Sequence, residues 1–371
     1  MRVLFTGGGT GGHVYPAIAL ADALGNRAQV RFVGTADRLE AQIVPRAGYE
    51  LRTINAAPLS RSATRESLKT AAINIARVAQ ALREVRAFAP DVIVATGGYV
   101  CFPVMTAARM LRAAGLSRAR CALLEPNAQP GLTNRLLAPI VDEVWGAYAA
   151  AEPYFGKRFR LTGIPVRASL MRPRNRVEAA RRLGLDASRQ TITAIGGSQG
   201  ARRINETIAA LVTRRELPAQ WQLLHICGTR DYEYMQAEER EPFGGNRVSL
   251  RPYVEEMADV YELTDLAIAR SGASTLGEFA ALGIASVLVP YPHAADNHQL
   301  RNAQVFEQAG AAAILDDRSL DEDTLWWTLR DVMQPEKLGA MRAAARSLAN
   351  IDALPTILAR IDELAARRTS A

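Results

Sequence analysis

Several kinds of residue and segment are scarce in this 371-residue chain, and each scarcity excludes a class of protein. Only three cysteines occur, and their wide spacing fits neither a disulfide framework nor a metal site, so we expect buried thiols in a reducing compartment. No apolar run approaches the roughly 20 residues that span a bilayer, and no signal-peptide core follows Met1, so we expect a cytoplasmic protein. Aromatic residues make up 6%, which argues against a nucleic-acid-binding protein.

Positive charge is plentiful and unevenly placed. The net charge is +7, yet residues 1–165 hold 20 basic and 11 acidic side chains, whereas residues 166–371 hold 25 and 27. Arginine supplies nearly all of the positive charge, because Lys69, Lys157 and Lys337 are the only lysines. The basic first half indicates a polyanionic partner, either nucleic acid or an anionic membrane surface.

Short apolar runs alternate with Ala- and Arg-rich helical patterns along the chain. This alternation predicts α/β architecture with doubly wound parallel sheets whose strands are buried on both faces. The length fits two domains, and a Gly-Ile-Pro turn at 163–165 marks the boundary between two Rossmann-like domains that face each other. Expected helices include Pro16–Leu24, Leu68–Phe88 and Ile204–Arg214. The expected strands are Val3–Thr6, Val30–Gly34, Leu51–Ile54, Val92–Ala95, Cys121–Glu125, Val144–Tyr148, Thr191–Ile195, Gln222–Ile226, Val248–Arg251, Leu266–Ala269, Ser286–Pro290 and Ala312–Leu315.

Three glycine-rich turns follow predicted strands, at 7–12, 97–98 and 196–200. Glycine lets a backbone approach a ligand closely, and a helix N-terminus at the carboxyl edge of a sheet favours anions. The first turn also fits the dinucleotide fingerprint, so a dinucleotide-dependent oxidoreductase is an alternative. That class expects an acidic residue at the end of the second strand, and Asp37 comes late for this role.

Polar side chains at predicted helix starts are candidates for chemistry. His13 is a candidate general base, because its pKa range lies near neutral pH. Ser274 or Thr275 is expected to cap the helix after the strand Leu266–Ala269, with Glu278 in its first turns. Glu278 either accepts hydrogen bonds from the vicinal hydroxyls of a ribose or is favoured there by the helix dipole. His298 and Gln299 are either ligands of sugar hydroxyls or ordinary residues of a helix start.

Seven motifs in a fixed order then point to one family: Gly-Gly-Thr-Gly-Gly-His, Gly-Gly-Tyr, Glu-x-Asn-x-x-x-Gly-Leu-Thr-Asn-Arg, Gly-x-Pro-Val-Arg, Gly-Gly-Ser-Gln-Gly-Ala-Arg, Arg-Ser-Gly-Ala-x-Thr-x-x-Glu and Asp-x-x-Gln-x-x-Asn-Ala. Together they resemble the bacterial N-acetylglucosaminyltransferases that convert lipid I to lipid II. The resemblance implies the GT-B fold. It implies an acceptor- and membrane-facing domain over 1–163 with a returning C-terminal helix in 350–371, and a UDP-GlcNAc-binding domain over 164–349.

The resemblance also implies which residues bind the donor, UDP-N-acetylglucosamine. Glu278 would bind the ribose, the backbone of Val254 the uracil, and Gln299 with His298 the sugar hydroxyls. The other implied donor-binding residues are Thr10, Gly11, Gly12, Asn127, Arg167, Ser198, Gln199, Ala273, Ser274, Thr275, Leu276 and Gly277.

On the acceptor side, the resemblance implies that two loops hold the diphosphate of a polyprenyl-linked muramyl peptide. His13 would take the proton from the attacking C4 hydroxyl in an inverting displacement, with Glu125 as the alternative base. No metal cofactor is expected, because the spacing in Asp321-Glu322-Asp323 favours a helix cap. Proteins of cell-wall synthesis and division are expected partners. The implied acceptor-binding residues are Gly9, Thr96, Gly97, Gly98 and Tyr99.

The chain departs from the family pattern beside the acceptor loops. Leu124 and Pro126 stand where the family has histidine and glutamine, which removes an expected acceptor contact, and Phe102 is bulkier than the usual residue. The segment Arg61–Arg86 has an apolar stripe bordered by arginines, which suits either docking on an anionic membrane or a solvated helix. We therefore expect a peripheral protein at the cytoplasmic face of the membrane. Another GT-B enzyme with a different lipid or natural-product acceptor is the remaining alternative.

Overall fold

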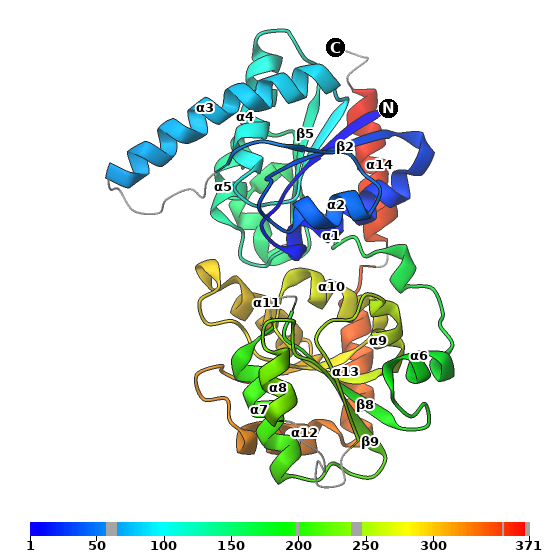
Figure 1. Cartoon of the computed structure of the whole chain (residues 1–371). Helices are drawn as coiled ribbons and strands as arrows, with labels where there is room; N and C mark the ends of the chain where they lie inside the picture. The colour runs from blue at the N-terminus through cyan, green and yellow to red at the C-terminus, as the bar shows by residue number, and fades with distance from the viewer. Residues whose placement is uncertain (57–64, 198–199, 239–246, 351, 368–371) are drawn as a thin grey trace. The chain divides into compact units, whose positions relative to one another are not determined.

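The chain folds into two compact units. The structure, a computed structural model, describes residues 1–56, 65–197, 200–238, 247–350 and 352–367, without the side chains of residues 65–76. One unit comprises Met1–Arg167 and Asn350–Ala371, and the other Ala168–Ala349 (Figure 1). The division falls four residues after the boundary that the sequence predicts at 163/164.

The described part of the N-terminal unit holds a seven-stranded sheet with the order β3-β2-β1-β4-β5-β6-β7, and every pair is parallel. Because its crossovers are helices, helices cover both faces. Its strands are β1 (Arg2–Thr6), β2 (Gln29–Gly34), β3 (Leu51–Thr53), β4 (Val92–Ala95), β5 (Arg120–Glu125), β6 (Glu143–Gly146) and β7 (Phe159–Leu161). Its α-helices are α1 (Gly11–Leu24), α2 (Glu40–Arg46), α3 (Arg65–Phe88), α4 (Cys101–Ala113), α5 (Leu132–Leu137) and α14 (Ala353–Ala366).

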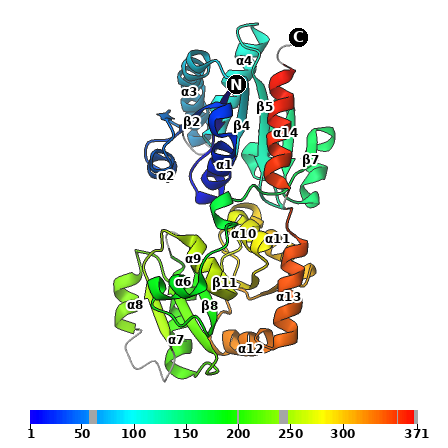
Figure 2. The same ribbon diagram turned by 90° about the vertical axis from the view of Figure 1, so that its right-hand side faces the viewer.

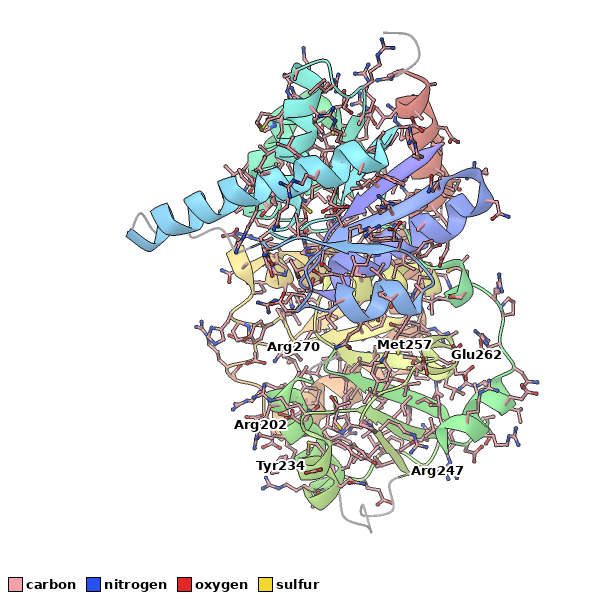
Figure 3. All side chains as sticks on the ribbon, turned by 45° about the horizontal axis from the view of Figure 1, so that its top comes forward. Arg202, Tyr234, Arg247, Met257, Glu262 and Arg270 are labelled. Carbon is pink, nitrogen blue, oxygen red and sulfur yellow. The ribbon has the colours of Figure 1, made fainter. Side chains whose placement is uncertain are left out.

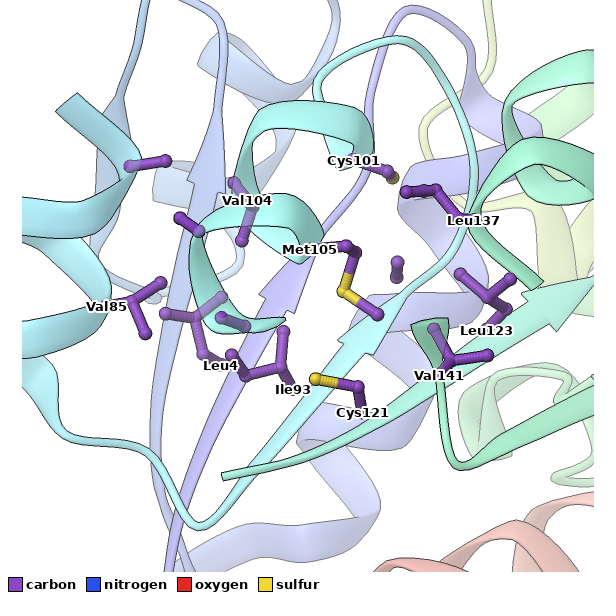
Figure 4. Packing of buried hydrophobic residues seen from close by; sticks show 14 of the residues in the cluster. Leu4, Val85, Ile93, Cys101, Val104, Met105, Cys121, Leu123, Leu137 and Val141 are labelled. Carbon is purple, nitrogen blue, oxygen red and sulfur yellow. The ribbon is translucent and has the colours of Figure 1, made fainter. Parts of the chain in front are cut away.

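Two apolar cores explain why the strands of this sheet are continuous hydrophobic runs. Successive side chains of a strand point to opposite faces. On β1, Leu4 packs into one core with α3 and α4 side chains (Figure 4), whereas Val3 and Phe5 pack into the other. The second core contains side chains of α1 and α14, which contact each other (Figure 2). Leu124, at which the chain departs from the family pattern, is wholly buried in this second core, so it is a packing residue.

The described part of the second unit holds a six-stranded parallel sheet with the order β10-β9-β8-β11-β12-β13. Its strands are β8 (Gln190–Ile195), β9 (Trp221–Ile226), β10 (Val248–Arg251), β11 (Thr264–Ala269), β12 (Ala285–Leu288) and β13 (Ala312–Ile314). Its α-helices are α6 (Arg176–Leu183), α7 (Arg202–Arg214), α8 (Tyr232–Glu238), α9 (Met257–Leu263), α10 (Ala273–Leu282), α11 (His298–Gln308), α12 (Glu322–Val332) and α13 (Pro335–Ser347). In both sheets the order reverses direction beside the first strand, which is the arrangement of doubly wound folds.

Helix starts differ from the sequence-based expectations in two places. The first helix begins at Gly11, five residues before the predicted Pro16, so His13 lies in its first turn. Gly272 is the N-cap of α10, so neither Ser274 nor Thr275 caps it. The capping role expected at 321–323 is confirmed, because the Asp321 carboxylate accepts the Thr324 N–H at 2.8 Å in a capping box.

Candidate active site

The glycine turn after β1 interlocks with the loop after β4, because these two strands are neighbours in the sheet. Gly8 donates its N–H to the Gly97 carbonyl at 3.2 Å. A Cβ on Gly98 would lie 2.4 Å from the Gly8 oxygen, and one on Gly7 would lie 2.1 Å from Thr96 Oγ1. Only glycines allow this approach. The structure therefore brings the 7–12 and 96–99 loops together at the carboxyl edge of the N-terminal sheet.

His13 is held at this meeting point by its own loop. Its Nδ1 lies 2.9 Å from the carbonyl oxygen of Gly8 and 3.5 Å from Thr10 Oγ1. A carbonyl oxygen can only accept, so Nδ1 carries the hydrogen in the shorter contact. Nε2 lies against the 96–99 loop, since a Cβ on Gly97 would come within 2.7 Å of it. The ring is thus oriented with Nε2 as the nitrogen that can accept a proton.

Cys101 begins α4, and its buried thiol lies under the same loops. Its Sγ lies 3.1 Å from the Gly97 carbonyl oxygen and 3.4 Å from that of Thr6. Burial raises the pKa of the Cys101 thiol to about 12, so it is a protonated donor at neutral pH. Phe102 is partly buried and packs against the core cluster. Cys101 and Phe102 therefore support the 96–99 loop from the side of the apolar core.

Glu125 ends β5, and both of its carboxylate oxygens accept hydrogen bonds from residues 127–134, which follow it in the chain. Its Oε1 accepts hydrogen bonds from the backbone and side-chain nitrogens of Asn127 at 3.0 and 3.1 Å. Its Oε2 accepts from Gly131 N–H at 3.2 Å and from Asn134 Nδ2 at 2.9 Å. Burial raises the pKa of this carboxyl group, although the four donors oppose that shift. These contacts favour an organising role over that of a base, and Asn134 as a partner was missed in the sequence.

Arg167 is the last residue of the first of the two segments that form the N-terminal unit. Its guanidinium lies over the ring of Tyr15 on α1, 4.6 Å from the centroid. This cation–π contact places Arg167 beside the helix that carries His13.

In the second unit, the glycine turn after β8 leads into α7. Gly200 has a φ of +79°, and a Cβ there would lie 2.4 Å from the Cys227 carbonyl oxygen, so glycine is required. Ser198 and Gln199 lie outside the described residues. At the start of α7, Arg202 pairs with Glu206 at 2.8 Å and lies over the ring of Tyr234 (Figure 3).

The turn between β11 and α10 is tied to the start of α11. The buried Ser271 hydroxyl donates to the Gln299 carbonyl at 2.8 Å, and Asn302 Nδ2 lies 3.3 Å from the Ser271 carbonyl oxygen. Gln299 Oε1 accepts the Tyr291 N–H at 3.0 Å. The structure thus brings the Ala273–Gly277 helix start and Gln299 together. His298 Nδ1 contacts the Ala295 carbonyl oxygen at 2.7 Å.

Glu278 lies in the second turn of α10 and is fixed by a tyrosine. The Tyr261 hydroxyl on α9 donates to Glu278 Oε2 at 2.5 Å, and the Tyr261 ring meets Phe279 edge-on at 6.1 Å. A carboxylate held in this way is oriented before any ligand arrives. Tyr261 is a site residue that the sequence analysis missed. Val254 comes shortly before α9 and lines a cavity of about 500 Å³ that Tyr253 and Arg251 also border.

The described residues provide neither a metal-binding cluster nor a membrane-spanning helix. They hold no cluster of three or more histidine, cysteine, aspartate or glutamate side chains placed to bind a metal ion. Within the same residues, no helix combines the length and apolarity that a membrane span requires.

Known proteins match the chain over nearly its whole length. Residues 3–145 match the glycosyltransferase family 28 N-terminal domain, and residues 191–355 match the family 28 C-terminal domain. A protein of Moorella thermoacetica is 40% identical over 369 residues, covering 96% of this chain and 97% of its own. One of Desulforudis audaxviator is 38% identical over 381 residues, covering 100% of both. Both are named UDP-N-acetylglucosamine--N-acetylmuramyl-(pentapeptide) pyrophosphoryl-undecaprenol N-acetylglucosamine transferase.

Solved structures agree. The crystal structure of Acinetobacter baumannii MurG has a TM-score of 0.76 and 27% identity, covering 98% of this chain and 99% of its own. A UDP-GlcNAc 2-epimerase from Neisseria meningitidis, at 13% identity and a TM-score of 0.65, shares the fold. Two α/β units, each built on a parallel sheet, are the units of a GT-B glycosyltransferase. The chain belongs to glycosyltransferase family 28, among the UDP-N-acetylglucosamine--N-acetylmuramyl-(pentapeptide) pyrophosphoryl-undecaprenol N-acetylglucosamine transferases.

Proposed function

We propose that the chain transfers N-acetylglucosamine from UDP-N-acetylglucosamine to the C4 hydroxyl of the muramyl sugar of lipid I, giving lipid II for peptidoglycan synthesis. The observation that carries the chemistry is the placement of His13. Its Nδ1 is engaged by the Gly8 carbonyl, and its Nε2 lies beside a second glycine loop. A general base needs this fixed orientation to take a hydroxyl proton in the transition state.

The second unit supplies the donor site in this proposal. Glu278, oriented by Tyr261, accepts hydrogen bonds from the ribose hydroxyls. The α10 N-terminus at Ala273–Gly277 has no acidic residue in its first turn, which suits a diphosphate there. Gln299 and His298 bind the sugar hydroxyls, and the Val254 backbone binds the uracil. Ser198 and Gln199, both outside the described residues, complete the diphosphate contacts.

The N-terminal unit binds the acceptor and the reacting end of the donor sugar. Thr96–Tyr99 and Gly9 hold the acceptor diphosphate. Gly9 donates its N–H to Glu40, so it contributes the close approach that a residue without a side chain allows. Thr10, Gly11, Gly12, Asn127 and Arg167 contact the donor sugar and nucleotide. The C4 oxygen attacks the anomeric carbon in line, UDP leaves, and the configuration inverts. The α10 helix dipole stabilises the charge that develops on the leaving UDP, without a metal cofactor.

We also propose that the N-terminal unit docks on the anionic inner membrane, where its acceptor lies. Among the side chains that the structure describes in this unit, four large apolar ones are more than half exposed: Met110 at 51%, Leu116 at 59%, Leu136 at 51% and Leu161 at 56%. Arginines such as Arg109, Arg118 and Arg135 occur beside them in the sequence. Exposed apolar groups with basic neighbours suit the interface of an anionic bilayer. In the Arg61–Arg86 segment, Leu68 and Ile75 lie outside the described side chains, whereas Leu82 and Val85 pack in the core.

The test is incubation of the purified chain with labelled UDP-N-acetylglucosamine and either lipid I or a generic lipid-linked hydroxyl acceptor. We expect transfer to lipid I alone, with UDP released in equal amount. Transfer to neither acceptor by a folded protein would refute the proposal. Transfer to the generic acceptor but not to lipid I would assign the chain to another acceptor class.

A further inference from the structure

The peptide bond between Gly8 and Gly9 is bound at both of its polar atoms. Its carbonyl oxygen, on Gly8, lies 2.9 Å from His13 Nδ1. Its N–H, on Gly9, donates to Glu40 Oε2 at 2.9 Å. A peptide unit is planar and rigid, so the two partners are coupled through one group. Glu40 and His13 therefore stand at opposite ends of the same peptide.

Glu40 is built into this position. Glu40 is the first residue of α2 and is only 1% exposed. Oε1 accepts the Thr35 N–H at 3.0 Å and the Thr35 hydroxyl at 2.7 Å. Two glycines make room for it, because a Cβ on Gly8 would lie 2.2 Å from Oε1 and one on Gly34 would lie 2.7 Å from Cγ. The carboxylate is thus confined and has a donor on each oxygen.

We propose that Glu40 is a positioning residue for His13 and acts through the Gly8–Gly9 peptide. A carboxylate bonded to the N–H of a peptide polarises it, and its carbonyl becomes a stronger acceptor. The stronger acceptor holds the hydrogen on Nδ1 and stabilises the imidazolium that forms when Nε2 takes a proton. A Ser-His-Asp triad uses the same logic with direct contact between carboxylate and histidine. The inference rests on the proposed role of His13 as the general base.

A double-mutant cycle tests the coupling. Glu40→Gln keeps the shape of the side chain but replaces one of its two acceptor oxygens by an NH₂ donor. The donors are Gly9 N–H on one side and Thr35 on the other, so the amide nitrogen must face one of these N–H groups. We expect kcat to fall about tenfold, part of the roughly 10²–10⁴-fold that a general base contributes, with KM for UDP-N-acetylglucosamine unchanged within about twofold. In a His13→Gln background, Glu40→Gln should change kcat by less than about twofold.

The matched control is Glu50→Gln. Glu50 lies in the same unit and pairs with Arg31 and Arg52 at the surface. This variant should retain wild-type kcat. Wild-type kcat in a folded Glu40→Gln protein would overturn the proposal. So would an equal loss with and without His13, because that result would mean a general effect on the loop.

A second measurement does not depend on turnover, and its result for the wild type does not depend on the folding of Glu40→Gln. Long-range ¹⁵N–¹H correlation of the histidine rings reports which nitrogen is protonated, with His13 assigned by its absence from His13→Gln. We expect neutral wild-type His13 to carry its hydrogen on Nδ1, and Glu40→Gln to raise the Nε2-protonated population. A wild-type His13 protonated on Nε2 would overturn the proposal. If the wild type fails to transfer sugar, the proposed function fails. The tautomer of His13 in the wild type and in Glu40→Gln still tests whether Glu40 holds the hydrogen on Nδ1.

Discussion

Replacing Tyr261 by phenylalanine isolates the contact that orients Glu278. The substitution removes the hydroxyl that donates to Glu278 Oε2 at 2.5 Å and keeps the buried ring that packs on Phe279. A hydrogen bond to a charged group contributes about 1.5–3 kcal/mol in proteins. Because the ring stays, we expect the unit to remain folded, with Glu278 less well oriented.

The cost to nucleotide binding follows from the freedom that Glu278 gains. Ordering one flexible side chain on binding costs about 0.5–1.5 kcal/mol. The ligand must now supply this ordering, since Tyr261 no longer does. A loss of this size raises the Kd for UDP roughly two- to tenfold. The loss should require the ribose diol, because that is the group Glu278 is proposed to bind.

Calorimetry with UDP and 2′-deoxyuridine diphosphate gives the readout. Tyr261→Phe should weaken UDP binding and leave binding of the deoxy analogue nearly unchanged, and Glu278→Ala should bind both with similar affinity. Tyr232→Phe is the matched control, because Tyr232 on α8 loses only a hydrogen bond from Gln236 Nε2 at 3.1 Å. Equal weakening for both nucleotides, or none for UDP, would refute the assignment of Glu278 to the ribose.

Three further predictions concern the N-terminal unit. His13→Gln should lower kcat about 10²–10⁴-fold while calorimetry shows unchanged UDP-N-acetylglucosamine affinity; near-normal turnover would point to another base. Ile361→Ala should lower the free energy of unfolding by about 2–5 kcal/mol in urea titration, because this α14 side chain is fully buried; a loss below 1 kcal/mol, about that of a surface change, would contradict its place in the core. Burial opposes ionisation of Asp142, yet hydrogen bonds from the Cys121 N–H and Arg112 outweigh it and hold the pKa of Asp142 below its usual value. Its stabilisation is therefore present above about pH 4 and is lost as pH falls through the lowered pKa. Asp142→Asn should lower the free energy of unfolding at pH 7 and lower it progressively less as the pH falls below 4; a loss that does not change with pH would contradict this.

Features that depend on local pattern could be predicted from the sequence. The strand β4 has the expected bounds, because its run of four apolar residues is short and rich in β-branched side chains, which favours a strand buried on both faces. The cap at Asp321 was likewise predictable, since capping uses residues within one turn. The strand β7 was missed, because Phe159–Leu161 is only three residues long, which is too short for its apolar–polar alternation to indicate a strand.

Features set by packing between distant elements could not be predicted in this way. The Glu40–Gly9 bond joins residues 31 positions apart, and the Tyr261–Glu278 bond joins residues 17 apart. No periodicity in the sequence specifies that these side chains meet. The start of α1 at Gly11 was also missed, because glycine has poor helix propensity and Pro16 resembles a first helical residue.

The return of α14 to the first unit affects the order in which a nascent chain becomes folded. Residues 1–167 leave the ribosome first, yet their core needs Ile357, Ile361 and Leu364, which are translated after the whole of Ala168–Ala349. The uninterrupted second unit can complete its core as it emerges, because domains fold as units during synthesis. The first unit is therefore the last to be finished. Until α14 docks, the apolar side chains of α1 and β4 that it contacts are exposed to chaperones and proteases.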